Sequence, residues 1–214
     1  MTVIAIDGPA GSGKGTLARR LADELGLRHL DTGLLYRATG AKLLAQGGNA
    51  DDTQRALAAA RALDLASIAD EPALRTEEAG SAASMVAAMP EVRAALLQMQ
   101  RDFAAEPPGA VLDGRDIGTV VCPDAELKIF LTAASEARAK RRFQELRAAG
   151  EPSIYADILK DVEERDWRDT NRADAPLKPA VDAHVIDTTL LDADEVLAQA
   201  LEKINDLKPS NRCT

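Results

Sequence analysis

The sequence predicts an α/β fold in which a five-stranded parallel sheet is flanked by helices. Short apolar runs alternate along the chain with longer stretches of helical spacing, which is typical of a parallel sheet covered on both faces. A glycine-rich loop joins the first run to the first helix. Apolar residues make up 46% of the 214 residues and aromatic residues only 3%, so alanine- and leucine-rich helices must supply much of the core.

The first strand, the loop and the first helix form one motif. Residues 3–6 are apolar and partly β-branched, as expected of a buried strand, and residues 8–16 contain four glycines together with Lys14. Leucines then recur at every fourth position as far as Gly26, which suits a left-handed helix stop. Glycines let backbone N–H groups point inward, and the helix N-terminus and Lys14 add positive charge. The motif therefore predicts a phosphate-binding P-loop.

One position of this loop departs from the general P-loop pattern. That pattern has Ser or Thr directly after the lysine, where the hydroxyl binds Mg²⁺. Here Gly15 follows Lys14, and Thr16 comes next. The alternative interpretation is a glycine-rich turn without a ligand, but the flanking strand and helix favour the phosphate site.

Residues 27–106 predict one strand and a group of helices. The double glycine Gly47-Gly48 ends the first helix, Thr76 precedes a later one, and Pro90 fits the first position of the last. The expected elements are a strand over residues 27–30, a helix from near Leu34 to Gly47, an alanine-rich helix over 51–66, a loop over 67–76, a helix from 77 to about Ala88, and a helix from Pro90 to Pro107-Pro108-Gly109.

The second half of the chain predicts three more strands and three helices. Ser135 and Ser153 are expected to cap two of these helices, and Asp192 with Glu195 resembles a capping box for the last. The expected elements are strands over residues 110–113 and 127–131 and at Val185-Ile186, helices from Ser135 to Gly150, from Ser153 to about Trp167 and from Asp192 onward, a polar segment over 168–179, and a loose tail after Leu207.

Polar residues follow three of the expected strands where each strand ends. They are residues 8–14, then Asp31 and Thr32, and then residues 113–116. Ligands of open α/β sheets bind outside the carboxyl ends of the strands. We therefore expect the three stretches to converge on one cleft.

Charge and cysteine content exclude several classes of function. A net charge of −9 argues against a nucleic-acid polymer as the main partner, although it leaves room for a small phosphorylated ligand in a local basic cleft. Cys122 and Cys213 are too few for a disulfide framework or a metal cluster. We expect no cleavable signal before Val3, and no apolar run approaches the ~18 residues of a membrane span. We expect a cytoplasmic monomer with no membrane partner.

Several motifs together resemble those of a known family. Thr32-Gly33-x-x-x-Arg37 and Leu112-Asp113-Gly114-Arg115 resemble the two acceptor motifs of nucleoside monophosphate kinases, which also share the glycine after the P-loop lysine. Taken in order over nearly the whole chain, the motifs resemble those of the bacterial-type cytidylate kinases. The further motifs that carry this likeness are Asp31-Thr32-Gly33-x-x-Tyr36-Arg37, Asp113-Gly114-Arg115-Asp116-Ile117-Gly118-Thr119-Val120-Val121 and Arg165-Asp166-x-x-Asp169-x-Asn171-Arg172-x-x-Ala175-Pro176-Leu177.

The resemblance implies a P-loop NTPase fold over residues 1–214, with a helical mononucleotide-binding lobe and a small lid. It places the core at 1–36 and 107–214, the lid at about 138–165 and the lobe at about 37–106. Two features depart from the family pattern. Residues 66–76 are too short for the small antiparallel insertion often found in the lobe, and Thr32 stands where Ser is common.

The implied reaction is ATP-dependent phosphorylation of CMP and dCMP, with Mg²⁺. By resemblance, Lys14, Arg37, Arg115 and Arg172 are catalytic, and Asp113 holds the metal through water, with a turn or capping role as the alternative. The implied ATP-binding residues are Gly8, Pro9, Ala10, Gly11, Ser12, Gly13, Lys14, Gly15 and Thr16; those for the acceptor nucleotide are Thr32, Tyr36, Arg37, Ser84, Arg93, Arg115, Asp116, Arg165, Asp169 and Arg172.

Elementary chemistry supports part of this assignment. The nucleophile would be a phosphate oxygen, which is largely ionised at pH 7, so no side-chain base is required. His29 and His184 are accordingly expected to be structural or solvent-exposed. Asp116 could accept a hydrogen bond from the cytosine amine, where uracil presents a carbonyl. The cations of residues 138–147 favour an anion contact in a lid, with a solvated helix face as the alternative.

Two alternative functions remain open at this stage. The first is a P-loop kinase for another small acceptor, such as UMP, AMP, shikimate or dephospho-coenzyme A. The second is a nucleotide-dependent switch that binds partner proteins, but the Asn-Lys-x-Asp motif that selects guanine in such switches is absent from the sequence.

Overall fold

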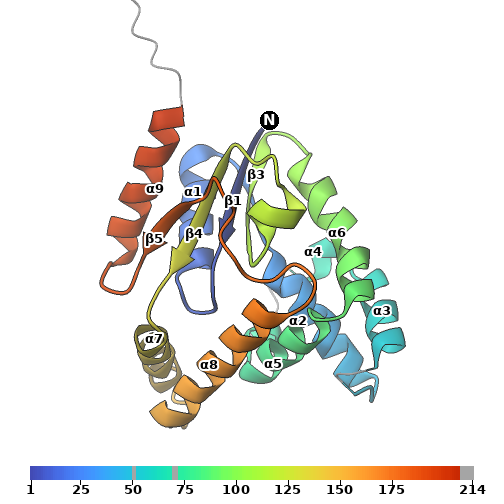
Figure 1. Ribbon diagram of the computed structural model, residues 1–214. Helices are drawn as coiled ribbons and strands as arrows, with labels where there is room; N and C mark the ends of the chain where they lie inside the picture. Colours follow the sequence, from blue (N-terminus) through green and yellow to red (C-terminus); the bar gives the residue numbers. More distant parts are fainter. Residues whose placement is uncertain (50–51, 69–71, 208–214) are drawn as a thin grey trace, which may run out of the picture.

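The computed structural model describes residues 1–49, 52–68 and 72–207, and its centre is a parallel sheet (Figure 1). The strand order is β2-β3-β1-β4-β5, and all pairings are parallel. The predicted five-stranded parallel sheet is therefore confirmed. Its strands are β1 (Thr2–Asp7), β2 (Arg28–Asp31), β3 (Gly109–Gly114), β4 (Leu127–Thr132) and β5 (His184–Asp187).

Helices follow each strand and cover the sheet. A π-helical turn at Ile117–Val121, which was not expected, follows β3. A 3₁₀ turn covers Pro72–Arg75, within the segment expected to be a loop. The α-helices are α1 (Lys14–Leu25), α2 (Thr32–Ala45), α3 (Thr53–Arg61), α4 (Leu65–Ile68), α5 (Glu77–Val86), α6 (Pro90–Ala104), α7 (Ser135–Ala148), α8 (Tyr155–Asn171) and α9 (Ala193–Leu207).

The two faces of the sheet have separate cores because side chains alternate along a strand. Ile4 and Ile6 of β1 pack with leucines of α1 and with α9. Ala5, between them, packs on the opposite face with Leu112 and Ala104 of α6. Figure 1 shows α1 and α9 together on one side of the sheet and α6 on the other.

Helices α2, α3, α5 and α6 form a third core around Leu35, Leu43 and Leu96. Helices α2 and α5 approach closely at Gly40, where a Cβ atom would lie 2.7 Å from Ala82 Cβ. Most of the region expected to be the mononucleotide-binding lobe is thus helical. Its assignment as a lobe, and that of residues 138–165 as a lid, stay predictions.

The capping predictions have mixed outcomes. The box at Asp192 and Glu195 is confirmed, since each side chain accepts a hydrogen bond from the other's backbone N–H at 2.9 Å. The predicted cap at Ser135 is wrong: Ala134 precedes the helix, and Ser135 Oγ instead donates to Glu136 Oε2 at 3.3 Å. The predicted cap at Ser153 is also wrong, because Ile154 is the N-cap residue of α8.

Two predicted helix boundaries are also corrected. The helix expected over residues 51–66 ends at Arg61, and α4 is a separate turn. Helix α8 continues to Asn171 instead of ending near Trp167, because the charged side chains of its last turn have tertiary partners.

The tail after Leu207, with Cys213, lies outside the described residues. Among the described helices, none is both long and apolar enough to cross a membrane.

The capping box gives a stability prediction. Replacing Asp192 by Ala removes acceptors for two N–H groups of α9, at 2.8 and 2.9 Å, and should cost about 1 kcal/mol. For a chain of this size we expect the melting temperature to fall by roughly 2–4 °C in differential scanning calorimetry. Glu202→Ala, an exposed change in the middle of the same helix, is the control; equal shifts for both variants would contradict the capping role.

Candidate functional site

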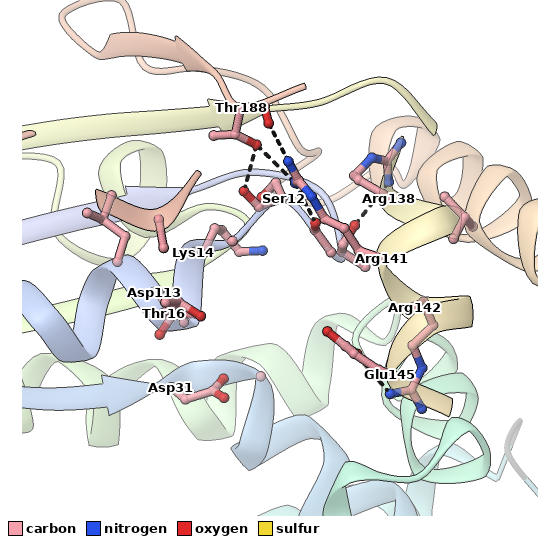
Figure 2. A pocket seen from close by; sticks show the side chains of 18 of the residues that line it. Ser12, Lys14, Thr16, Asp31, Asp113, Arg138, Arg141, Arg142, Glu145 and Thr188 are labelled. Carbon is pink, nitrogen blue, oxygen red and sulfur yellow. Dashed lines mark hydrogen bonds and ion pairs between the residues drawn. The ribbon is translucent and has the colours of Figure 1, made fainter. Parts of the chain in front are cut away.

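A cleft of about 640 Å³ lies at the carboxyl edge of the sheet, where the three polar stretches were expected to meet. Figure 2 shows Lys14 extending into it, with Asp31, Thr16 and Asp113 on one side and arginines of α7 on the other. The side chains and backbone that line it come from residues 10–17 of the loop, the ends of β2 and β3, helices α2, α7 and α8, and residues 188–196.

Three glycines of the loop, Gly8, Gly11 and Gly13, have positive φ angles. Gly8 has φ +149°, and a Cβ atom there would lie 2.1 Å from the carbonyl oxygen of Leu131, so only glycine fits. Gly13, at φ +94°, immediately precedes α1. Lys14 Nζ donates to the carbonyl oxygen of Pro9 at 2.8 Å, which holds the side chain across the loop. The expected residues from Ala10 to Thr16 all line the cleft.

Lys14 is electrostatically unusual. Burial, together with the nearby positive charge of Arg115, lowers its pKa to about 7. Asp31 shows the opposite effect: burial raises its pKa, and so does the negative charge of Asp113. The carboxylates of Asp31 and Asp113 act on Lys14 in the direction opposite to burial, because they favour its charged form.

Asp113 has a partner that the sequence reasoning did not find. His29 Nε2 lies 2.8 Å from Asp113 Oδ1, and Thr32 Oγ1 donates to the carbonyl oxygen of Asp113 at 2.8 Å. His29 thus contacts a candidate site residue, whereas it was expected to be only structural or solvent-exposed. The feature that could have indicated this contact is the position of His29 on β2, which pairs in parallel with β3.

Three of the expected acceptor residues, Arg37, Arg115 and Arg165, line the same cleft. Arg115 Nε donates to Asp169 Oδ2 at 2.7 Å. Burial opposes ionisation of Asp169, but Arg115 holds the pKa of this carboxyl below its usual value. The guanidinium groups of Arg37 and Arg165 come together over α5, since a Cβ atom at Gly80 would lie 3.3 Å from each. Arg37 also donates to backbone carbonyls of the 3₁₀ turn and of Thr76.

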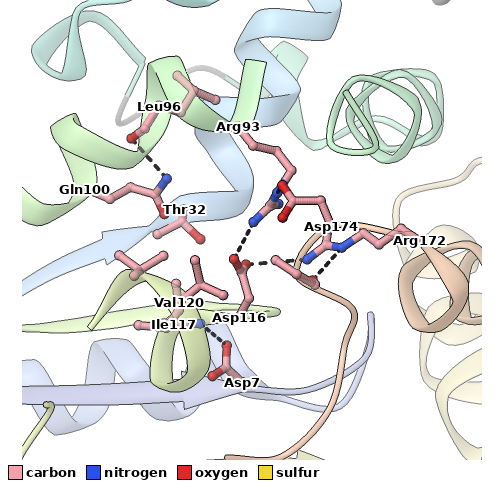
Figure 3. Close-up of polar contacts among 12 residues, drawn as sticks. Asp7, Thr32, Arg93, Leu96, Gln100, Asp116, Ile117, Val120, Arg172 and Asp174 are labelled. Atoms are coloured by element: carbon pink, nitrogen blue, oxygen red, sulfur yellow. Dashed lines mark hydrogen bonds and ion pairs between the residues drawn. The ribbon is translucent and has the colours of Figure 1, made fainter. Parts of the chain in front are cut away.

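A second group of expected residues surrounds Asp116 (Figure 3). Arg93 from α6 donates to one carboxylate oxygen of Asp116, and Arg172 lies 3.5 Å from the other. Arg93 also contacts Tyr36 Oη at 3.4 Å and Asp174 Oδ2 at 2.9 Å. The sequence reasoning missed Asp174, which lies in the polar segment after α8.

Asp7 fixes the turn that carries Asp116. Its carboxylate accepts hydrogen bonds from the backbone N–H groups of Ile117 at 2.7 Å and Gly118 at 2.8 Å. Burial raises the pKa of Asp7 to about 6. Because Asp7 directly precedes Gly8, one buried side chain connects the glycine loop to the Asp116 turn. The sequence reasoning treated Asp7 only as the end of a strand.

Ser84 lies apart from this group. Its hydroxyl accepts a hydrogen bond from Arg168 Nε at 3.2 Å. It lines a separate, largely apolar hollow of about 470 Å³, together with Met85 and Trp167. Arg172 borders both the hollow and the Asp116 cluster.

The cationic side chains of α7 have different partners. Arg141 donates to the carbonyl oxygen of Thr188, while Arg142 pairs with Glu145 at 3.3 Å. Both line the cleft, as Arg138 does. Lys140 is exposed, and Arg147 lies over the ring of Phe143 at 5.7 Å. The expected run of cations therefore has one face toward the cleft and another toward solvent.

Known proteins match this chain over nearly its whole length. A family model described as "Cytidylate kinase" matches residues 4–206. The chain is 59% identical over 210 residues to a protein of Methylocella silvestris named "Cytidylate kinase", covering 98% of this chain and 97% of that one. It is 58% identical over 204 residues to one of the same name from Rhodospirillum rubrum, covering 94% and 95%.

Solved structures support the fold at lower similarity. A sugar kinase from Janibacter has a TM-score of 0.52 at 16% identity, covering 98% of this chain and 97% of that one. An uncharacterized protein from Eubacterium ventriosum has a TM-score of 0.53 at 15% identity, covering 96% and 99%.

The lowered pKa of Lys14 predicts proton uptake when a triphosphate binds. At pH 8 the free protein holds Lys14 mostly neutral, since its pKa is about 7. Phosphate oxygens favour the ammonium form, so binding a non-hydrolysable ATP analogue should take up a large fraction of a proton at pH 8. Titration calorimetry in buffers of different ionisation enthalpy measures this uptake. It should be lost in Lys14→Met, and no uptake by the wild type would contradict the assignment.

Proposed function

Because the chain belongs to the cytidylate kinase family and therefore transfers a phosphoryl group from ATP to CMP, we propose that this transfer takes place in the cleft at the carboxyl edge of its sheet. The observation that carries the proposal is that one cleft is lined both by the glycine loop and by Arg37, Arg115 and Arg165. We propose dCMP as a second acceptor.

The glycine loop binds the phosphates of ATP in this proposal. Backbone N–H groups from Gly8 to Thr16 and the N-terminus of α1 surround the β-phosphate, and Lys14 neutralises the β- and γ-phosphates. Thr16, on the first turn of α1, lines the cleft and supplies a hydroxyl. The loop therefore holds the γ-phosphoryl group at a fixed position facing the acceptor arginines.

The acceptor phosphate attacks in line without a side-chain base. A phosphate monoester is largely dianionic at pH 7, so its oxygen is already a nucleophile. Arg37, Arg115 and Arg172 neutralise the negative charge as the two anions meet, and a planar guanidinium suits this because it binds two phosphate oxygens at once. Asp169 orients Arg115 through the 2.7 Å contact.

The residues beside Lys14 fit a Mg²⁺ ion. Asp31 and Asp113 supply carboxylate oxygens, and the raised pKa of Asp31 reflects burial and a neighbouring negative charge that a cation would offset. Mg²⁺ prefers one or two carboxylates together with substrate phosphates and waters. Asp113 would hold the ion through water, with His29 fixing the orientation of its carboxylate. The bound ion would neutralise charge on the β- and γ-phosphates.

Recognition of the nucleoside is proposed for the cluster around Asp116. Asp116 accepts from the cytosine amine, while Arg93, Tyr36 and Thr32 shape the acceptor site. Arg165 and Asp169 contact the ribose. The carboxylate of Asp169 can accept further hydrogen bonds besides the one from Arg115. Ser84 would reach the base only if its contact with Arg168 rearranges, which fits a site that closes as the nucleotide binds.

We propose that α7 and α8 close over ATP and exclude water, which limits wasteful hydrolysis. We also propose that the protein is a monomer, because residues of one chain line the cleft. We propose a cytoplasmic location because the proposed substrates are nucleotides of the cytoplasm.

A coupled assay with purified protein tests the proposal. We expect ADP formation with CMP and dCMP at a kcat/KM well above that for UMP or AMP. Equal rates with CMP and AMP would contradict cytosine selection and favour a kinase for another acceptor.

Asp116→Asn tests the base-reading role. The variant keeps the shape of the side chain but replaces one acceptor oxygen with a donor, so kcat/KM for CMP should fall by roughly 10- to 100-fold, and for UMP by much less. Asp174→Asn is the matched control, because it changes the other carboxylate that binds Arg93. Equal losses for CMP and UMP in Asp116→Asn would show that Asp116 does not read the amine.

A further inference from the structure

Asp166 on α8 has a partner that the proposed mechanism does not use. Asp166 belongs to the sequence motif that also contains Arg165 and Asp169. Its carboxylate accepts two hydrogen bonds from the guanidinium of Arg138, one of them at 3.0 Å to Oδ1. The side chain of Arg138 is only 4% exposed. The Asp166 side chain is 26% exposed, so a buried guanidinium is held by a partly exposed carboxylate. The contact has two points, which fixes geometry better than a single hydrogen bond does.

Arg138 in turn holds the glycine loop. Its guanidinium donates to the carbonyl oxygen of Ala10 at 3.0 Å and to that of Ala133 at 2.9 Å. The loop also packs against the same side chain, since a Cβ atom at Gly11 would lie 3.3 Å from Arg138 Cβ. The position of Ala10 and Gly11 thus depends on where Arg138 is held.

Within one turn, helix α8 contacts both the side of the cleft formed by the glycine loop and the side formed by the segment after β3. Asp166 reaches the glycine loop through Arg138, and Asp169, three residues later, orients Arg115 at the end of β3. Residues three apart lie on the same side of a helix. A shift of α8 that follows binding in one half must therefore move a side chain that supports the other half.

We propose that Asp166 is a positioning residue that connects the ATP-binding loop to α8, so that binding of ATP and binding of CMP favour each other. This inference rests on the proposed function of the cleft. Without the Asp166 carboxylate, the buried guanidinium of Arg138 keeps its charge but loses both hydrogen bonds to Asp166. It then no longer fixes the carbonyl group of Ala10. The loop then has to be ordered by ATP itself, which weakens ATP binding and slows transfer.

Asp166→Asn tests the inference, with Glu163→Gln as the control because it neutralises an exposed carboxylate on the same helix. Titration calorimetry with a non-hydrolysable ATP analogue and with CMP, each alone and in the presence of the other, gives the coupling factor. For Asp166→Asn we expect the analogue to bind about tenfold more weakly, CMP alone to bind as in the wild type, and the coupling factor to fall toward one. Glu163→Gln should behave as the wild type does.

The result that overturns the inference is a folded Asp166→Asn protein with unchanged affinity for the analogue and unchanged coupling. If that variant does not fold, Arg138→Lys replaces it, since it keeps the charge and removes the two-point contact; the same losses are expected, and unchanged values contradict the inference. The test is separable from the proposed function, because CDP formation by the wild type decides the latter, whereas affinity for the ATP analogue does not depend on which acceptor is used.

Discussion

The site depends on the pairing of buried arginines with carboxylates at the carboxyl edge of the sheet. Buried cations that lie close together repel one another, and burial together with the charge of Arg115 lowers the pKa of Lys14 to about 7. Carboxylates compensate it: Asp169 pairs with Arg115, Asp166 with Arg138, and Asp116 lies between two arginines. Such pairs offset the positive charge of the arginines around the cleft.

The order of the strands makes this arrangement possible. Strand β1 lies between β3 and β4, so the glycine loop after β1 emerges beside the Asp113–Asp116 segment that follows β3. Asp7 joins the two by accepting from the N–H groups of Ile117 and Gly118. Helix α8 then lies across the cleft and supplies two of the carboxylates. The glycine loop and the Asp113–Asp116 segment are thus neighbours because of topology, and buried hydrogen bonds to Asp7 support their relative position.

Much of this was predictable from the sequence. The parallel sheet, the P-loop and the convergence of three polar stretches follow from local patterns, because strand periodicity and glycine spacing are properties of short segments. The pairs His29–Asp113, Arg93–Asp174 and Arg168–Ser84 were not predicted, since they join residues between 81 and 84 positions apart. The caps proposed at Ser135 and Ser153 failed because residue type alone does not locate the first helical turn.

If one cleft holds both nucleotides, their phosphates meet among the same cations. Titration calorimetry with a bisubstrate analogue, in which adenosine and cytidine are joined through five phosphates, tests this arrangement. One molecule is expected to bind per chain, about 100-fold more tightly than CMP or ATP alone, and to exclude both. Binding no tighter than that of ATP, or simultaneous binding of CMP, would contradict a shared cleft.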